Sequence, residues 1–412
     1  MSLDTRIELP ETRIPFARTE ISRKAREAAA RVLSSGWVTS GPEVASFEQE
    51  FAEWVASREA AAVSSCTAAI ELSLRALRLP RGARVLASTM TFCGAVNAII
   101  HAGLRPVLVD VNPETLMPDA TTIAPAVRRE GGVEAMTVLH FAGHPAPVEE
   151  LAEAARLPLD LVIEDAAHAL GARAGNRSIG TISAATCFSF YATKNLPIGE
   201  GGIVTTDRSD VADYVRRARL HGMSKDAWKR YLPGSEWRYS VDEPGIKANM
   251  TDIQAAIGRG QLSHLLSWQE RRSELAARYD VGLCSVDGIA LPARPADGVH
   301  AWHLYVVRVL PSFGVDRDTL MSELSARGID CSVHFIPLHL MPYMRDARDG
   351  AIRPDDFPNA DRVFPQVLSL PLYPGLLDSD VDRVCASIAE VREVSRAGRA
   401  RGRSGTSLPP RR

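Results

Sequence analysis

The segment ATCFSFYATKNLPIGEGGIVT, residues 185–205, holds two short apolar runs with a lysine and a glycine-rich turn between them. The runs Ala185–Phe190 and Gly202–Thr205 are apolar through most of their length, which is typical of strands covered on both faces of a sheet. Functional groups of such sheets gather where strands end and loops converge. Lys194 lies at such a place and is a candidate imine-forming amine, because apolar shelter makes loss of its proton easier. The alternative is an ordinary surface lysine.

Similar apolar runs recur before this segment and alternate with helical patterns. The alternation predicts an α/β fold with a large, mainly parallel sheet. Helical patterns such as Thr67–Leu77 and Val148–Ala155 stand between the runs. The five further strands are expected at Ala60–Ser64, Arg84–Ala87, Pro106–Asp110, Ala135–Leu139 and Leu161–Glu164.

The pattern changes on the C-terminal side, where a smaller α+β unit is expected. Its elements are a long helix Asp252–Tyr279, a strand Trp302–Leu310, a helix Arg317–Arg327, a strand Cys331–Phe335 and a helix Ser379–Val394. We therefore predict four parts: an N-terminal arm and helix in residues 1–40, a large α/β domain in 41–265, a small domain in 266–394 and a disordered tail in 395–412. Within the first part, Ser22 is expected to cap the helix and Gly36 to end it. The tail is expected to be disordered because it is rich in Arg, Gly, Ser and Pro.

Composition excludes several classes of protein. Hydrophobic residues make up 45% and charged residues 24% of the 412, as in globular proteins. The net charge of -2 gives no general attraction to nucleic acid or to an anionic membrane. No signal segment and no apolar run of ~18 residues is present, so we expect a cytoplasmic protein. The six cysteines are scattered without a C-x-x-C pair, which argues against a zinc site, and no metal is expected.

Two further motifs supply parts of a possible cofactor site. In LVIEDAAHALG, residues 161–171, Asp165 follows a strand and could hold a protonated pyridinium nitrogen, with His168 nearby. In SSCTAA, residues 64–69, small residues open a helix and could cradle a phosphate. Phe92 could stack on a flat ring. The alternatives are helix capping by Asp165, Ser65 or Thr67, a buried structural imidazole and a core aromatic. Together with Lys194, the set predicts a pyridoxal-phosphate site.

These motifs together resemble the DegT–DnrJ–StrS sugar aminotransferases, from about Ile14 to Val394. The stretches that carry the resemblance are GWVTSGP, VSSCTAAIELSL, VIEDAAHALG, FSFYATKNLPIGEGG and ANMTDIQAAIG. It implies a pyridoxal-phosphate-dependent transferase of fold type I, similar to aspartate aminotransferase. Four more stretches look like the branch that aminates C4 of nucleotide-linked 4-keto sugars, such as the enzyme forming UDP-4-amino-4-deoxy-L-arabinose: LHFAGHPAPV, LHGMSKDAWKRY, HAWHLYVVRV and SVHFIPLH.

The resemblance also implies roles for individual residues. Lys194 would carry the cofactor as a Schiff base, Asp165 would pair with the pyridine nitrogen, and His168 would lie near the ring 3-hydroxyl. An asparagine from the partner subunit reaches the phosphate in this family, which implies a homodimer with shared sites. Phosphate contacts would come from Thr67, Ala68, Ser189 and the partner's Asn249, ring stacking from Phe92, and substrate contacts from Trp37, Thr39, Lys225, Arg230, Tyr231 and His334.

The expected reaction moves an amino group from L-glutamate to C4 of a nucleotide-linked 4-keto sugar. A composition rich in Ala and Arg suggests a high-GC genome, and with it a TDP-linked 4-keto-6-deoxy sugar destined for a natural product. The alternatives are amination at C3 of a 3-keto sugar nucleotide and a non-catalytic cofactor-binding regulator. Relatives that dehydrate the sugar carry histidine in place of Lys194. A nicotinamide enzyme is disfavoured because no G-x-G-x-x-G follows a predicted strand.

Overall fold

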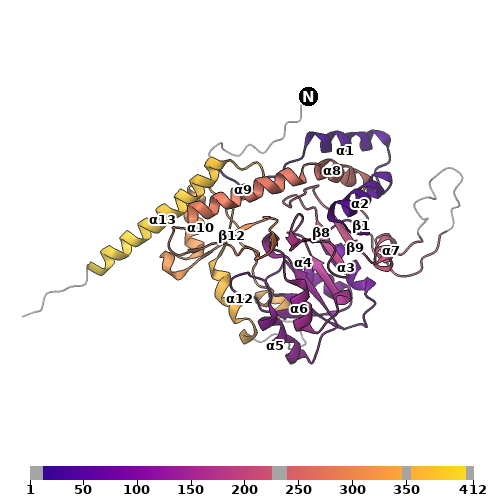
Figure 1. Ribbon diagram of the computed structural model, residues 1–412, viewed down its shortest axis with the longest axis horizontal. Helices are drawn as coiled ribbons and strands as arrows, with labels where there is room; N and C mark the ends of the chain where they lie inside the picture. Colours follow the sequence, from indigo (N-terminus) through magenta and orange to yellow (C-terminus); the bar gives the residue numbers. More distant parts are fainter. Residues whose placement is uncertain (1–12, 225–238, 346–353, 405–412) are drawn as a thin grey trace, which may run out of the picture.

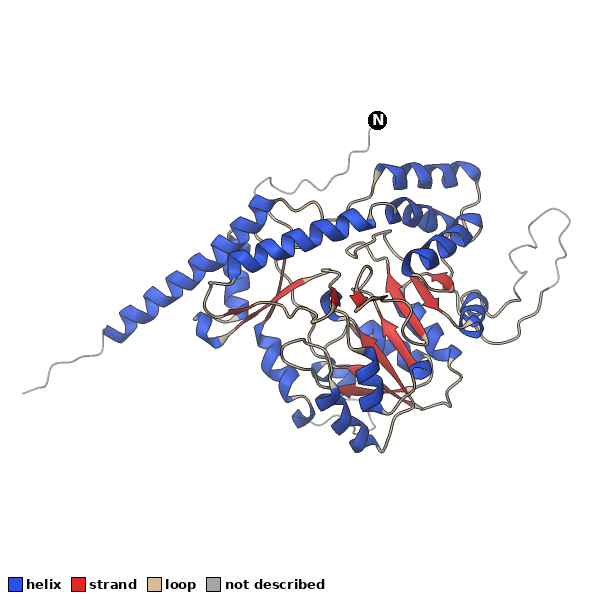
Figure 2. Cartoon of the chain, in the orientation of Figure 1, coloured by secondary structure: helices blue, strands red, loops and turns tan. Residues whose placement is uncertain are grey.

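A seven-stranded sheet forms the centre of the molecule (Figures 1 and 2). The computed structural model describes residues 13–224, 239–345 and 354–404. The strand order is β1-β9-β8-β5-β4-β2-β3, and β9 alone runs antiparallel to its neighbours β1 and β8. The seven strands expected from the sequence are those of this sheet: β1 Glu59–Val63, β2 Arg84–Ser88, β3 Arg105–Val109, β4 Ala135–Leu139, β5 Val162–Asp165, β8 Ala185–Ser189 and β9 Gly202–Thr206. The predicted α/β class with a mainly parallel sheet is confirmed.

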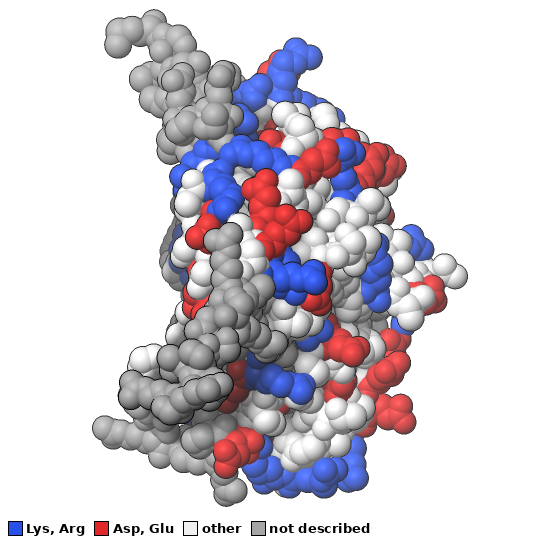
Figure 3. Space-filling model, turned by 90° about the vertical axis from the view of Figure 1, so that its left-hand side faces the viewer, with Lys and Arg blue, Asp and Glu red and all other residues white. Residues whose placement is uncertain are grey.

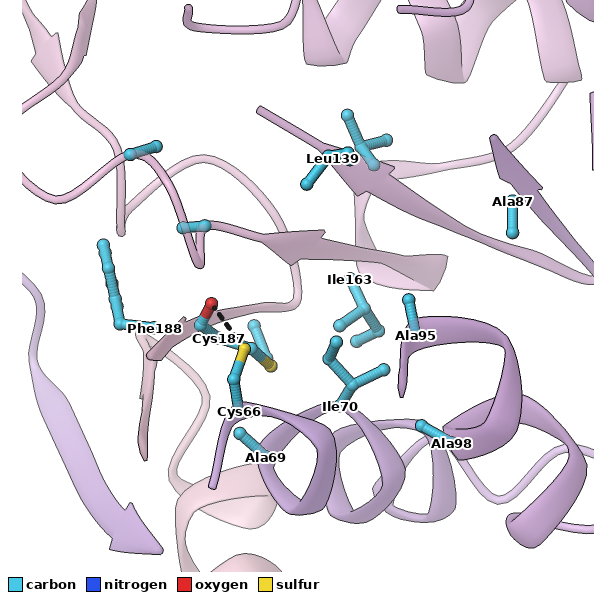
Figure 4. Close-up of a cluster of buried hydrophobic side chains, with 14 of the residues drawn as sticks. Cys66, Ala69, Ile70, Ala87, Ala95, Ala98, Leu139, Ile163, Cys187 and Phe188 are labelled. Carbon is cyan, nitrogen blue, oxygen red and sulfur yellow. Dashed lines mark hydrogen bonds between the residues drawn. The ribbon is translucent and has the colours of Figure 1, made fainter. Parts of the chain in front are cut away.

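Helices cover both faces of this sheet, which explains why its strands are apolar throughout. Successive side chains of a strand point to opposite faces. On β8, Phe188 contacts Phe51 of α2, with ring centroids 5.3 Å apart. Cys187 points to the other face, where its thiol lies 3.5 Å from the hydroxyl of Ser73 on α3. Figure 4 shows α3 packed on that face. The helices around the large sheet are α2 Pro42–Val55, α3 Cys66–Ala76, α4 Cys93–His101, α5 Ala120–Glu130, α6 Val148–Ala155, α7 Ser209–Ala218 and α8 Asp252–Leu262.

A second hydrophobic core surrounds a three-stranded antiparallel sheet of order β10-β12-β13. Tyr279 and Tyr305 stack at its centre, 4.7 Å apart, and both are fully buried. The elements around it are β10 Ile289–Ala290, β12 Tyr305–Val309, β13 Val367–Leu370, α9 Leu265–Leu283, α10 Arg317–Ala326 and α13 Asp378–Ser404. Further elements are two short helices, α11 Pro342–Arg345 and α12 Pro358–Val363, and a small sheet of β6 Arg173–Ala174, β7 Arg177–Ser178 and β11 Gly298–Val299.

The predicted N-terminal helix, with its cap and its end, is confirmed. Helix α1, Arg23–Ser35, is capped by the side chain of Ser22 and ends at Gly36, whose φ of 75° is the left-handed conformation that glycine adopts without cost. The arm before it crosses to the second core, where Ile14 bridges to Ile329. The arm therefore links the first described residues to the C-terminal half of the chain.

Three expectations about the C-terminal half are wrong. The long helix is two helices, α8 and α9, and the break follows Leu262, where the Ser263 hydroxyl bonds to the Gly260 carbonyl. The stretch Cys331–Phe335 forms only one bridge, at Ser332, and the third strand of the small sheet is instead β13. Residues 395–404, expected in a disordered tail, are helical as the last part of α13, and residues 405–412 lie outside the described residues.

Two properties of the described residues bear on partners. Within them, no helix is long and apolar enough to cross a membrane. On the face shown in Figure 3, basic and acidic side chains are interspersed, as the net charge of -2 leads one to expect.

Candidate active site

A cavity of about 500 Å³ opens where β5 and β8 end, next to the N-terminus of α3. Carboxyl ends of parallel strands and a helix N-terminus thus meet at one place, the usual location of a ligand site in such a sheet. The structure brings together at its wall half of the site residues singled out from the sequence: Thr67, Phe92, Asp165, His168, Ser189, Lys194 and His334.

Lys194 lies in the turn after β8, where its backbone N–H donates to the carbonyl of Tyr191 at 2.9 Å. Its amine reaches into the cavity and lies 3.5 Å from Nε2 of His303. Desolvation lowers the pKa of the amine to about 8, and nearby Asp165 and Cys66 only partly oppose this effect. A pKa of about 8 leaves roughly a tenth of the amines uncharged at pH 7, far more than in an ordinary lysine, and the uncharged form is the one that attacks a carbonyl.

Asp165 is the last residue of β5 and is 6% exposed. Turns follow β5, so Asp165 is no helix cap; its carboxylate accepts the N–H of Ala167 at 3.1 Å. Burial raises the pKa of this carboxyl group. A buried carboxylate of this kind is stabilised by a cationic partner, and a protonated pyridine nitrogen is one.

The N-terminus of α3 forms the opposite wall. Ser65 caps the helix, its hydroxyl accepting the N–H of Ala68 at 3.1 Å, so the capping alternative holds for Ser65. Ala68 is buried and its N–H is occupied, whereas Thr67 and Ser189 line the cavity. Gly202 on β9 lets this wall approach closely, because a Cβ there would lie 2.5 Å from the carbonyl carbon of Ser65.

The cavity is also lined by three histidines. His168 accepts the N–H of Ala142 on Nδ1 at 3.2 Å, so in the neutral ring the proton is on Nε2. His334 shares a hydrogen bond of 2.8 Å between Nδ1 and the Ser369 hydroxyl, and burial lowers its pKa to about 4. His303, which belongs to the stretch HAWHLYVVRV and was not among the predicted site residues, lies 4.6 Å from His168 between ring centroids.

Aromatic rings surround the mouth of the cavity. Phe92 lies just before α4 and is 60% exposed, so it is no core residue. Its ring is 6.1 Å from that of Phe335. Phe16, from the N-terminal arm, stacks on His334 with ring centroids 5.6 Å apart. Phe16, Tyr191 and Phe335 line the cavity and were not expected from the sequence, which gave no signal to separate them from core aromatics.

Other predicted residues lie elsewhere. Asn249 donates to the Ser40 hydroxyl at 2.7 Å, Trp37 donates from Nε1 to the Ser40 carbonyl at 3.2 Å, and the Thr39 carbonyl accepts the N–H of Asp252. These residues form one cluster that does not line the cavity of the same chain. Lys225, Arg230 and Tyr231 lie outside the described residues.

The donors around the cavity fit pyridoxal phosphate. Hydroxyls and a helix N-terminus suit the phosphate, a buried carboxylate suits the pyridine nitrogen, and a lysine of lowered pKa suits the aldehyde. An exposed phenylalanine can lie against the ring. The fold and this site define the class as pyridoxal-phosphate-dependent transferases of fold type I.

Comparison with known proteins identifies the family. Residues 19–389 match the DegT/DnrJ/EryC1/StrS aminotransferase family, and the chain belongs to it. It is 41% identical over 380 residues to the spore coat polysaccharide biosynthesis protein SpsC of Bacillus subtilis, covering 92% of this chain and 97% of that protein. The protein is therefore a pyridoxal-phosphate-dependent sugar aminotransferase, as the resemblance implied.

Solved structures agree with this assignment. A putative sugar aminotransferase from Streptococcus pneumoniae in its pyridoxamine-phosphate form superposes with a TM-score of 0.84 at 28% identity, over 94% of this chain and 100% of that one. DesV of S. venezuelae, solved with a ketimine intermediate, gives a TM-score of 0.81 at 35% identity, over 92% and 99% of the two chains.

Proposed function

We propose that the protein transfers the amino group of L-glutamate to C4 of a nucleotide-linked 4-keto sugar, with a TDP-linked 4-keto-6-deoxy sugar as the first candidate. The observation that carries the proposal is the convergence of Lys194, Asp165 and the N-terminus of α3 on one cavity of about 500 Å³. That volume is in the range of small-molecule sites.

The choice of C4 rests on the four stretches that resemble the C4 branch. Two of them meet beside the cavity: Gly143 accepts the N–H of Ala301 at 2.8 Å, and Ala142 accepts that of His303 at 3.0 Å. His334, from a third stretch, lines the cavity. Three of the four stretches used to choose the branch thus lie beside the cavity, and LHGMSKDAWKRY lies mostly outside the described residues. SpsC is described as a polysaccharide biosynthesis protein, so a precursor of a surface polysaccharide is a second destination for the product.

The residues of the chain divide the work of the reaction. Pyridoxal phosphate, when bound, supplies an electron sink for the carbon that loses its proton. Lys194 takes the proton from the α-carbon of glutamate and later returns a proton to C4 of the sugar. Asp165 holds a proton on the pyridine nitrogen. The proton on Nε2 of His168 is available to the ring 3-oxygen.

Binding and shielding complete the site. The phosphate is bound by Thr67, Ser189 and the N-terminal turn of α3, to which Ala68 also belongs. Phe92 lies against the ring, and its large exposed surface is covered when the ring and substrate bind. His334 contacts the sugar nucleotide. Water is thereby kept from the carbon that exchanges protons.

The active unit is a homodimer with shared sites. Asn249, Trp37 and Thr39 form a cluster outside the cavity of their own chain, which is where residues that serve a partner's site would lie. Mixing Lys194→Ala with Asn249→Ala subunits tests this. If Asn249 acts in the partner, mixed dimers regain one intact site each, roughly a quarter of all sites in an equal mixture. If Asn249 acts in its own chain, no activity returns.

Product analysis separates C4 from C3 amination. The loaded enzyme is incubated with L-glutamate and, separately, with 4-keto and 3-keto sugar nucleotides carrying UDP or TDP. NMR of the product is expected to show nitrogen on C4. Nitrogen on C3, or turnover confined to 3-keto substrates, would replace the proposal by the C3 alternative.

A further inference from the structure

We infer that His303, fixed by Asn195, is a positioning residue that orients the amine of Lys194 for both proton transfers. The inference rests on the proposed function, because it assigns a task to a residue beside the reacting amine. It starts from one contact, the 3.5 Å between Nζ of Lys194 and Nε2 of His303.

The hydrogen-bond pattern fixes which nitrogen of His303 carries the proton. The amide nitrogen of Asn195 donates to the carbonyl oxygen of Ala301 at 2.8 Å and lies 3.5 Å from that of Leu170. A carbonyl only accepts, so the Asn195 amide nitrogen faces those groups and its oxygen faces His303. That oxygen is 3.2 Å from Nδ1, which must then donate. In the neutral ring this leaves a lone pair on Nε2, directed at Lys194.

The surroundings keep this imidazole neutral. Burial lowers the pKa of His303 well below its usual value, and the neighbouring groups Lys194, His168, Arg272 and His334 lower it further. Arg272, on α9, is buried and donates to the backbone carbonyls of Trp302 and Leu372 at 3.1 and 3.0 Å, and to that of His303 at 3.4 Å. A fixed cation thus lies close to His303 and disfavours a second proton on its ring, so the neutral imidazole serves as a hydrogen-bond acceptor.

An acceptor at this position directs the amine. A neutral amine has two N–H groups and one lone pair, so donating one N–H to His303 restricts the lone pair to directions within the cavity. The proton moves from the substrate carbon to Nζ, and afterwards from Nζ to the receiving carbon. His303 keeps the same number of protons throughout and accepts a stronger bond while Lys194 is charged.

Two substitutions separate this role from a structural one. In His303→Gln the side chain can place an acceptor near the position of Nε2, whereas in His303→Asn it reaches only the position of Nδ1 and keeps the contact with Asn195. The glutamate half-reaction is followed in single turnovers, with protiated and 2-deuterated glutamate. Affinity for pyridoxal phosphate is measured separately. His300→Gln is the matched control, because His300 is equally buried but stacks on Trp302, away from Lys194.

We expect His303→Asn to slow the half-reaction about 10- to 100-fold, the scale of a misplaced reacting group. His303→Gln should lose less than about fivefold, and His300→Gln should react like the unchanged protein. The deuterium isotope effect should persist or grow in the asparagine variant, and cofactor affinity should stay within about threefold.

Other results would overturn the inference. They are equal losses in the glutamine and asparagine variants, an isotope effect that disappears, or a loss that follows cofactor affinity alone. If the unchanged protein forms no Schiff base or ignores glutamate, the proposed function fails instead. The two failures are therefore distinguishable.

Discussion

Gly202→Ala tests whether the close approach of β9 to α3 builds the phosphate end of the site. An alanine Cβ at this position would lie 2.5 Å from the carbonyl carbon of Ser65 and 2.6 Å from the nitrogen of Cys66. Ordinary contact begins at 3.4 Å, so the strand and the helix N-terminus must separate by about 1 Å. The clashing atoms are backbone, so no side chain can rotate to relieve the contact.

The cost follows from this displacement. Overpacking of a well-packed site typically costs about 1–3 kcal/mol. Gly202 pairs with Val63 on one side and Ser189 on the other, so a shift at this position moves the helix end and the Ser189 hydroxyl apart. If binding of the phosphate loses the same free energy, the Kd for pyridoxal phosphate rises roughly 5- to 150-fold.

The assay is a spectroscopic titration of the cofactor-free protein with pyridoxal phosphate, together with thermal unfolding. Gly375→Ala is the control, because its Cβ would meet nothing closer than 4.0 Å. Tight cofactor binding by Gly202→Ala, equal to that of the control, would refute the assignment of α3 and β9 as the phosphate wall. A loss of affinity in Gly202→Ala alone supports it.

Three further predictions concern the charged groups of the site. Burial lowers the pKa of Lys194 to about 8. The rate of Schiff-base formation, measured by stopped-flow mixing, should therefore rise about tenfold per pH unit up to about pH 8 and then become constant. A rate that continues to rise up to pH 10 would contradict this prediction. Lys194→Met should stabilise the cofactor-free protein by roughly 3 kcal/mol at pH 7, because lowering the pKa of the amine from 10.5 to about 8 costs about 1.36 kcal/mol per unit. The gain should shrink between pH 8 and 10.5, where the unchanged protein binds fewer protons folded than unfolded. A gain that stays constant with pH in urea unfolding would count against this reasoning. Asp165→Asn should slow the glutamate half-reaction by about 100-fold or more while the Schiff base still forms, and a near-normal rate would exclude the carboxylate from its role at the pyridine nitrogen.

The central sheet could be predicted because its signals are local. Each strand is an apolar run of about the length typical of buried strands. Asp165 is the last residue of β5, and Lys194 lies in the turn that follows β8. A parallel sheet then brings the ends of strands to one edge, so residues far apart in sequence could be assigned to one site. The capping side chain of Ser22 and the left-handed Gly36 are equally local signals.

The remaining features depend on tertiary contacts. His303 was expected within a strand, but Trp302 has a φ of 45° and β12 begins only at Tyr305, so strand alternation does not apply to the histidine. Phe16 reaches the cavity because the arm crosses the molecule, and no periodicity encodes that path. The break between α8 and α9 falls at Ser263 and His264, in a sequence that keeps its helical pattern.

The visible spectrum of the purified protein with pyridoxal phosphate, before and after L-glutamate, tests the central claim most directly. We predict a Schiff-base band that depends on Lys194 and converts to the pyridoxamine form when glutamate is added. A protein that forms no such band, or forms the same band as Lys194→Ala, would contradict the assignment of Lys194. A band that glutamate leaves unchanged would contradict the assignment of the donor.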